Sequence, residues 1–258
     1  MTDTAPVDLV LSSTPAAGVR LLCLNRPEKR NALSQPLIRS LLSALSNASA
    51  DDHIFSIILT GNGPFFCAGA DLNDIATLDE AGARASRYLE DLCKGFAAVK
   101  KPIIAAVNGP ALGGGFEIAL MSDFIVSAEP AYFVLPETKI GLIPGAGGTQ
   151  RLTAAVGKYR AMRSILLAER MTAEEAMAAS LVASVVNPDN LTQRCLEMAS
   201  NFTAANRQTI EFAKQAICRA DDLGRDDGFE RDLYYTAFGT DEKKRGVDDF
   251  LTARRKKA

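Results

Sequence analysis

Short apolar runs alternate with amphipathic stretches along the first two thirds of the chain. Runs rich in branched aliphatic residues predict buried strands, and they lie at residues 19–24, 54–59, 103–107, 124–128 and 181–186. Apolar residues at helical spacing predict helices after Ser34-Gln-Pro36 and over about 80–99, with Leu37, Leu41, Leu42 and Leu45 on the first face and Ala85, Tyr88, Leu89, Leu92 and Phe96 on the second. Strands alternating with helices predict an α/β fold with a largely parallel sheet.

The last third of the chain changes character, because its pattern is helical to the end. Three apolar stripes at helical spacing consist of Leu191, Cys195, Met198 and Phe202, then Ile210, Ala213 and Ile217, then Val247, Phe250 and Leu251. We therefore predict an α/β core over residues 1–195 and a C-terminal helical subdomain over 196–258. No low-complexity linker separates the two, so we expect these helices to dock on the core or on a neighbouring subunit.

Composition excludes several classes of partner. The chain has 258 residues, 47% hydrophobic and 23% charged, with a net charge of −2, which is typical of a soluble globular protein with no field that recruits nucleic acid or an anionic membrane. No apolar run approaches the roughly 18 residues of a membrane span, and the first eight residues lack the features of a signal peptide. Five scattered cysteines without a C-x-x-C motif indicate reduced thiols. We expect a cytoplasmic protein.

Three consecutive glycines, at 113–115, precede a helix-like segment that holds one carboxylate, Glu117. Glycines at a helix start allow close approach to the backbone and leave amide N–H groups free for an anion or a developing negative charge. On a helix, the neighbours of Glu117 three and four positions away are all non-polar, namely Gly113, Gly114, Leu120 and Met121. The pattern predicts a buried acid, which requires a partner or a task.

A second glycine turn, at residues 65–72, follows the strand predicted at 54–59. Gly69 permits an unusual backbone angle and Asp71 suits a helix N-cap, so an ordinary strand–turn–helix is one interpretation of this turn. A second acid, Glu137, precedes another glycine cluster at 145–148; taken alone, it fits an exposed loop glutamate. The four features together point to a site.

Other common catalytic signatures are absent from the sequence. His53 is the only histidine and has no cysteine or carboxylate cluster near it, which favours a solvated side chain over a metal ligand or a triad member. The sequence has neither a phosphate-binding P-loop nor a G-x-S-x-G nucleophile turn. The dinucleotide-binding fingerprint fails because Phe116-Glu-Ile118 follows Gly113-x-Gly115, which leaves no third glycine.

Four motifs stand out: C-A-G-A-D at 67–71, N-G-P-A-L-G-G-G-F-E at 108–117, P-E-T-K-I-G at 136–141 and P-G-A-G-G-T-Q-R-L at 144–152. These motifs resemble those of the enoyl-CoA hydratase/isomerase family, the crotonases. The likeness extends from Leu24-Asn-Arg-Pro27 to Phe238-Gly-Thr-Asp-Glu242, with the motifs in family order. The resemblance implies a crotonase-like spiral of ββα units with a C-terminal helical subdomain.

The resemblance also implies a reaction and a set of site residues. The amides of Ala70 and Gly114 match the family's oxyanion hole around a thioester carbonyl, while Glu117 and Glu137 match the two hydratase glutamates. Glu117 is then expected to activate water for attack at the β-carbon of a 2-enoyl-CoA, and Glu137 to protonate the α-carbon. The residues expected to bind the substrate are Lys29, Arg30, Ala32, Ala68, Ala70, Asp71, Leu72, Gly114, Pro136 and Phe250. CoA belongs to the substrate, so no cofactor or metal is expected.

One position near the C-terminus departs from the family pattern. Some members place a lysine three positions after the C-terminal phenylalanine, where this chain has Ala253. Arg254, Arg255, Lys256 or Lys257 are candidate replacements, although a basic chain end is also an ordinary solvated helix terminus.

Family members assemble as trimers or dimers of trimers, so we expect a homotrimer or a dimer of trimers. The alternative activity is a Δ3,Δ2-enoyl-CoA isomerase, which usually relies on one acid. An RNA-binding protein is the alternative of another class, and the near-neutral charge disfavours it.

Overall fold

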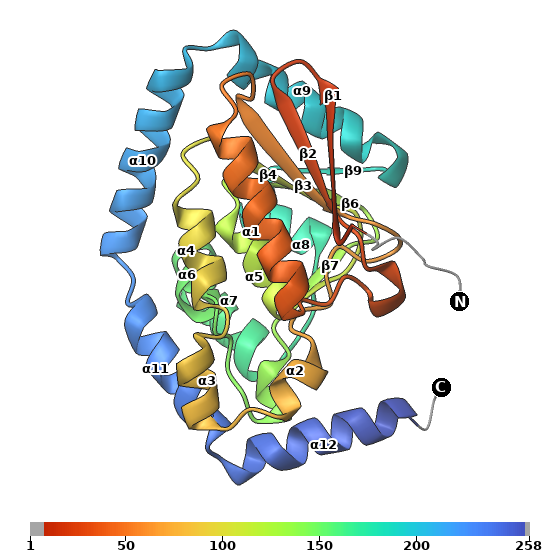
Figure 1. Cartoon of the computed structure of the whole chain (residues 1–258), viewed down its shortest axis with the longest axis vertical. Helices are drawn as coiled ribbons and strands as arrows, with labels where there is room; N and C mark the ends of the chain where they lie inside the picture. Colours follow the sequence, from red (N-terminus) through yellow and green to blue (C-terminus); the bar gives the residue numbers. More distant parts are fainter. Residues whose placement is uncertain (1–7, 256–258) are drawn as a thin grey trace, which may run out of the picture.

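A six-stranded sheet forms the centre of the chain, which the computed structural model describes over residues 8–255 (Figure 1). In spatial order its strands are β1 (Val10–Ala16), β2 (Val19–Leu24), β3 (Ser56–Gly61), β4 (Ile103–Val107), β6 (Phe124–Ala128) and β9 (Ser184–Val186). Strand β1 pairs antiparallel with β2, and every other pair in this sheet is parallel. The predicted α/β class with a largely parallel sheet is confirmed.

Helices and a small second sheet surround this centre. The helices are α1 (Gln35–Ala50), α2 (Leu72–Ala76), α3 (Glu80–Ser86), α4 (Glu90–Ala97), α5 (Gly114–Met121), α6 (Gly148–Val156), α7 (Lys158–Leu166), α8 (Ala173–Ala178), α9 (Leu191–Ala204), α10 (Arg207–Leu223), α11 (Asp227–Phe238) and α12 (Asp241–Arg255). The 3₁₀ helices within residues 8–255 are η1 (Pro27–Lys29), η2 (Glu137–Ile140) and η3 (Pro188–Asn190). The second sheet consists of β5 (Ala111–Leu112), β7 (Tyr132–Val134) and β8 (Met171–Thr172).

The two faces of the large sheet are buried under different helices, because side chains alternate along each strand. On β3, Ile57 and Leu59 join the main core, which includes the buried face of α1. Ile58 points to the other face, where it belongs to a second core with Cys195 of α9. Burial on both faces explains why the central strands are almost entirely apolar. The domain boundary predicted near residue 195 falls inside α9, a helix that covers this second face.

The helix predicted over about 80–99 is two helices, α3 and α4. Arg87 and Leu89, between them, adopt left-handed backbone angles, with φ of 50° and 65°, which no α-helix accommodates. Tyr88 and Leu89 are buried at the break, whereas Ala85 is exposed. The break lets α3 pack against α11 while α4 packs against α1 and α5. Tertiary packing therefore overrides a periodicity that fits one long helix.

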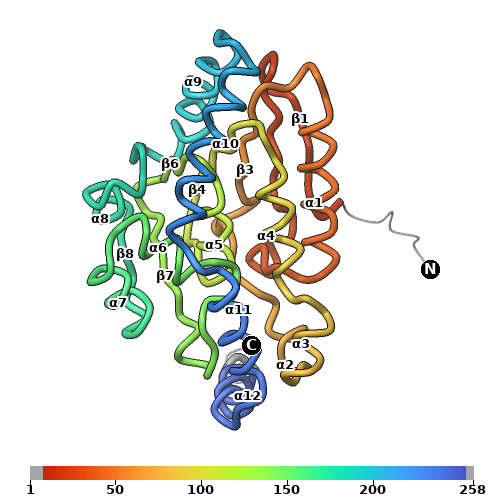
Figure 2. The backbone as a smooth tube through the Cα atoms, turned by 90° about the vertical axis from the view of Figure 1, so that its left-hand side faces the viewer, coloured from red at the N-terminus to blue at the C-terminus, as the bar shows by residue number. Residues whose placement is uncertain are grey.

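The C-terminal helices run along the outside of the chain. Helix α10 has no buried residue and forms the outer edge in Figure 1, so its predicted apolar stripe of Ile210, Ala213 and Ile217 is not buried within this chain. Helix α12 packs against η2 and α2, at the end of the molecule opposite α9 (Figure 2). Lys243 anchors it, since its buried Nζ donates to the carbonyls of Ile75 and Leu78, at 2.8 and 2.6 Å.

Three other sequence expectations concern His53, the cysteines and membrane-spanning segments. His53 is exposed, as a solvated histidine should be. The five cysteines, all within the described residues, are free thiols. From residue 8 to residue 255, no helix combines the length and apolar content needed to cross a membrane.

Candidate active site

Two glycine turns meet at the ends of neighbouring parallel strands. The turn after β3 pairs with the segment after β4 through a bridge between Cys67 and Ala111, and the Leu112 amide donates to the Cys67 carbonyl at 2.9 Å. At Gly69, where φ is 86°, a Cβ atom would lie 2.7 Å from the Leu112 carbonyl oxygen and 3.2 Å from the Gly114 nitrogen. Only a glycine allows this approach, which brings the two predicted turns into direct contact.

The amides of Ala70 and Gly114 lie on this contact. A Cβ atom on Gly114 would be 3.6 Å from the Ala70 nitrogen, so the two residues are immediate neighbours. No group among residues 8–255 accepts a hydrogen bond from either amide. Gly114 is also the first residue of α5, where backbone N–H groups have no partner within the helix and the helix dipole is positive. The geometry offers two neighbouring donors to a bound group with negative charge.

Glu117 stands in the first turn of α5 and is only 1% exposed. Its Oε1 accepts hydrogen bonds from the amides of Ala146 and Gly148, at 2.7 and 2.8 Å. Burial, followed by the charge of Glu230, raises the pKa of Glu117 to about 8, although the two amide hydrogen bonds act in the opposite direction. A carboxylate of this kind is a much stronger base than an exposed glutamate.

Glu137 begins η2 and lies beside the same glycine turn. Its Oε1 is 2.7 Å from the position that a Cβ atom on Gly113 would occupy. The residue is partly exposed, yet its Oε2 is buried and has no hydrogen-bond partner among the described residues. Burial, and then the charge of Glu117, raise the pKa of Glu137 well above its ordinary value. A carboxyl group that stays protonated and unpaired is suited to donate a proton.

The segment expected to bind the CoA end of the substrate is folded onto the first glycine turn. The Ala68 amide donates to the Arg30 carbonyl at 2.9 Å, and the Leu33 amide to the Gly69 carbonyl at 2.8 Å. Asp71 caps α2 by accepting from the Asn73 amide, while Leu72 is the first residue of that helix. Lys29 and Arg30 are exposed, Ala32 is half-buried, and Pro136 directly precedes Glu137. The structure thus packs the 30–33 segment against residues 68–69 of the first turn.

Phe250 is the predicted site residue that the structure places least firmly in this group. It lies on α12, which packs against η2, but its side chain is 44% exposed. Of the basic residues considered as replacements for the family lysine, Lys256 and Lys257 lie outside the described residues. The role of Phe250 remains a prediction from the resemblance.

Sequence reasoning missed two charged residues that shape the site. Arg26 donates to the Asp71 carboxylate at 2.7 Å and to the Ala32 carbonyl at 3.1 Å, which ties the two substrate-binding segments together. Glu230, on α11, is 1% exposed and binds the turn that holds Glu117. A signal for Glu230 exists in the sequence, because it precedes Tyr234 and Phe238 by four and eight positions and so shares their buried helical face.

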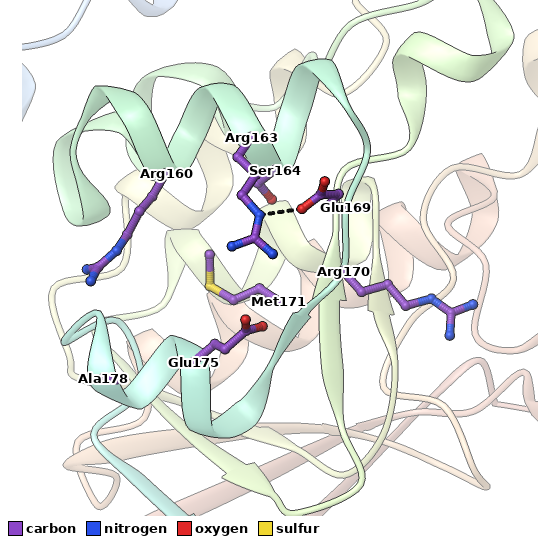
Figure 3. Close-up of a pocket in the computed structure, with 8 residues that line it drawn as sticks. All are labelled: Arg160, Arg163, Ser164, Glu169, Arg170, Met171, Glu175 and Ala178. Carbon is purple, nitrogen blue, oxygen red and sulfur yellow. Dashed lines mark hydrogen bonds and ion pairs between the residues drawn. The ribbon is translucent and has the colours of Figure 1, made fainter.

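A surface cavity of about 230 Å³ lies elsewhere, between α7, β8 and α8 (Figure 3). Its charged side chains are largely engaged with one another. Arg163 pairs with Glu169, the Arg170 guanidinium stacks 4.5 Å from the ring centre of Tyr132, and Glu175 accepts from the Thr172 amide. None of the predicted site residues lines this cavity. Its geometry gives no reason to place the chemistry there.

The chain is similar in sequence and in structure to known proteins. The profile of the enoyl-CoA hydratase/isomerase family matches residues 14–257. A probable mitochondrial enoyl-CoA hydratase of Dictyostelium discoideum is 41% identical over 249 residues, which cover 94% of this chain and 88% of that protein. The 2,3-dehydroadipyl-CoA hydratase of Escherichia coli strain K12 is 41% identical and covers 92% of this chain and 93% of its own. A crystal structure of an enoyl-CoA hydratase from Bacillus anthracis superposes with a TM-score of 0.78, at 32% identity over 96% of each chain.

A largely parallel α/β core followed by external helices is the architecture of a crotonase-fold protein. The sequence match covers nearly the whole chain, and the chain belongs to the enoyl-CoA hydratase/isomerase family. The family and fold predicted from the four motifs are confirmed.

Proposed function

We propose that this protein is an enoyl-CoA hydratase, which adds water across the 2,3-double bond of a 2-enoyl-CoA to give the 3-hydroxyacyl-CoA. The observation that carries the proposal is the pair of acids next to the unpaired amides of Ala70 and Gly114. Glu117 is buried, and Glu137 has a buried, unpaired Oε2. The hydratase names of relatives about 40% identical to this chain support it.

The two amides stabilise the charge that hydration creates. Attack of water on the β-carbon of a conjugated thioester moves negative charge onto the carbonyl oxygen. In the proposed reaction this oxygen accepts hydrogen bonds from Ala70 and Gly114, and the dipole of α5 adds to their effect. Each preorganised donor of this kind contributes roughly 10²–10³ in rate.

The two acids move the protons. Glu117, ionised and held by the Ala146 and Gly148 amides, takes a proton from the attacking water. Glu137, whose raised pKa keeps it protonated, donates a proton to the α-carbon. Each step of this kind contributes about 10²–10⁴ in rate. The water oxygen bonds to the β-carbon, and return of a proton from Glu117 to Glu137 restores both acids, so one molecule of water is added in total.

The deciding assay mixes the protein with crotonyl-CoA and follows loss of the absorbance of the conjugated thioester. We expect activity in the wild type and none in Glu117→Gln or Glu137→Gln, with binding of the CoA ester largely retained in both variants. In Glu117→Gln the new side chain keeps an oxygen that accepts from the two amides, so the site keeps its shape. Full activity in either variant would remove the hydratase assignment.

The same assay separates the alternatives. A Δ3,Δ2-enoyl-CoA isomerase would instead produce the conjugated absorbance from a 3-enoyl-CoA, and one of the two glutamates would then be dispensable. The presence of both acids favours hydration. A protein that binds RNA without catalysis would turn over neither substrate, and a direct RNA-binding measurement would identify it.

Hydration by two acids and two amides requires no metal or redox cofactor, and CoA is part of the substrate. We therefore expect the crotonyl-CoA activity to survive prolonged treatment with EDTA followed by removal of the chelator. Loss of activity that added metal restores would contradict this part of the proposal. The free thiol state of all five cysteines fits the predicted cytoplasmic location, which cell fractionation tests.

Assembly as a homotrimer or a dimer of trimers is the second part of the proposal. Large apolar side chains on the outer helices support it, since Ile217 and Leu223 of α10 are each 70% exposed and Phe212 is 61% exposed. Such groups usually mark a surface covered by another chain. Light scattering measures the mass directly, and Ile217→Glu should reduce it. A monomeric wild type would contradict the assembly.

A further inference from the structure

One short turn is held by two buried carboxylates that approach it from different helices. Successive amides of residues 146–149 bond alternately to one acid and to the other. Ala146 and Gly148 donate to Glu117 on α5, at 2.7 and 2.8 Å. Gly147 and Thr149 donate to Glu230 on α11, at 2.6 and 2.7 Å, and the Thr149 hydroxyl also donates to Glu230. Every amide of the turn therefore has a carboxylate partner.

Helix α11 supports this turn over more than one contact. Glu230 is 1% exposed, and Tyr234, one helical turn later, is 2% exposed. A Cβ atom on Gly145 would lie only 2.6 Å from atoms of the Tyr234 ring, so the ring packs directly against the start of the turn. The turn leads into α6, whose first amides lack partners within the helix. Glu117 and Glu230 satisfy the first two of those donors, the amides of Gly148 and Thr149.

We propose that Glu230 is a positioning residue for hydration. Its hydrogen bonds to the Gly147 and Thr149 amides fix the 146–149 turn, so that the Ala146 and Gly148 amides of that turn hold Glu117 in place. This inference deepens the proposed hydratase function and rests on Glu117 acting as the base. Glu230 does not touch the reacting atoms in this scheme. It acts through the turn and through the negative charge that it keeps close to Glu117.

The chemistry of the side chain explains why a glutamate is needed here. A carboxylate has two oxygens that accept, so Glu230 serves Gly147 with Oε1 and Thr149 with Oε2. A glutamine at this position offers one accepting oxygen and one NH₂ donor. One of the two amides would then face a donor, and a buried amide without an acceptor is costly. Glu230→Gln should therefore loosen the turn as well as remove a charge.

Glu230→Gln also removes a negative charge near Glu117, and this should change the pKa of Glu117. After burial, the charge of Glu230 is the next cause that raises the pKa of Glu117. The other ionisable groups of this region are Glu137 on η2, Arg231 and Tyr234 on α11, Cys93 on α4, and Arg151 on α6, which pairs with Asp227. Tyr88 lies at the break between α3 and α4. Glu230→Gln leaves all of these in place, so the pKa of Glu117 should fall.

The experiment compares pH profiles of crotonyl-CoA hydration for the wild type, Glu230→Gln and Thr149→Val. For Glu230→Gln we expect a loss of roughly 10² in kcat, since a misplaced catalytic group has effects of this size, with little change in binding of the CoA ester. We also expect the acid limb of the kcat/KM profile to move to lower pH by about half a unit or more. The loss of kcat/KM in Glu230→Gln relative to wild type should then be smaller at low pH than at high pH. Thr149→Val removes a hydroxyl donor but keeps the charge, so its acid limb should stay in place.

Two results would overturn the proposal. One is wild-type kcat in Glu230→Gln, and the other is a reduced kcat with an acid limb that does not move, which is the behaviour of a purely structural residue. If Glu230→Gln does not fold, Glu230→Asp replaces it, because aspartate keeps the charge but is too short to reach the turn in the same way. We expect Glu230→Asp to have a reduced kcat and an unmoved acid limb. Wild-type kcat in Glu230→Asp would also overturn the proposal. A wild type that does not hydrate crotonyl-CoA refutes the proposed function itself and is recognised before any variant is made.

Discussion

Gly113 and Glu137 are separated in the sequence but touch in the fold. A Cβ atom on Gly113 would lie 2.7 Å from Oε1 of Glu137, closer than a side-chain carbon approaches an oxygen in folded proteins. Gly113 also has a φ of 51° and donates its amide to the Val134 carbonyl at 2.8 Å. The glycine that begins the turn before α5 therefore leaves the space that the second acid occupies.

Gly113→Ala should strongly reduce hydration of crotonyl-CoA. The new Cβ atom displaces the Glu137 carboxyl group, and the left-handed backbone adds strain of about 1–3 kcal/mol. We expect kcat to fall by roughly 10² or more. Gly114→Ala is the matched control, because its Cβ atom would lie 3.6 Å from the Ala70 nitrogen and 3.1 Å from Cδ1 of Leu33, a flexible side chain. Wild-type activity in Gly113→Ala would mean that the Gly113–Glu137 contact does not matter.

Gly114→Pro tests the amide donor itself. Proline is well tolerated at the first position of a helix, and Gly114 is the first residue of α5, so the helix should persist while the N–H group is lost. We expect kcat/KM for crotonyl-CoA to fall by at least about 10². The ring also occupies the space in front of the amide, and therefore Gly114→Ala, which adds a side chain but keeps the N–H, is measured beside it. Circular dichroism confirms the fold. A proline variant as active as the alanine variant would rule out this donor.

The pH dependence of hydration follows from the two acids. Glu117 must be ionised to accept a proton, and its pKa is raised to about 8. Glu137 must be protonated to donate one, and its pKa is raised well above the ordinary value. We expect kcat/KM to rise with pH until about 8 and to fall again once Glu137 loses its proton. Because the two groups interact, the limbs report the pair. Crotonyl-CoA hydration measured from about pH 5.5 to pH 10 checks this, and a maximum at the acid end would contradict it.

Strands buried on both faces were the most predictable part of the fold. Strands β2, β4 and β6 begin and end where the apolar runs do, because strands buried on both faces consist mostly of apolar side chains. Strand β3 begins two residues later than expected. Ile54 is buried, but its amide donates to the Asp51 carbonyl in the preceding turn. Burial alone does not mark the start of a strand, since that depends on backbone partners that lie elsewhere in the chain.

The same contrast holds for the site. Glu117 could be recognised from its apolar helical neighbours, which left it no solvated face. Glu230 could not be recognised in this way, because Asp226, Asp227, Arg231 and Asp232 surround it in the sequence. Its partners, the amides of Gly147 and Thr149, are more than eighty residues away in the chain. Local patterns reveal an isolated buried charge. For a buried charge in a charged segment, the helical spacing of Glu230 to Tyr234 and Phe238 is a weaker local signal, and its partners become known only after the chain has folded.

The burial of Glu117 should also affect stability. Its pKa is about 8 in the folded chain against an ordinary 4.5, so its contribution to stability is fully present below about pH 4.5 and is lost as the pH rises through about 8. Glu117→Gln cannot lose a proton and keeps an oxygen for the Ala146 and Gly148 amides. We therefore expect this variant to be as stable as wild type near about pH 5 and more stable near about pH 8 by a few kcal/mol, because each pKa unit corresponds to about 1.4 kcal/mol. Thermal unfolding across this pH range measures the widening difference, and Glu129→Gln, at an exposed site, should show none. A stability difference between Glu117→Gln and wild type that is largest at low pH would mean that burial does not raise the pKa of Glu117. The role of Glu117 as the base would then need another source of proton affinity.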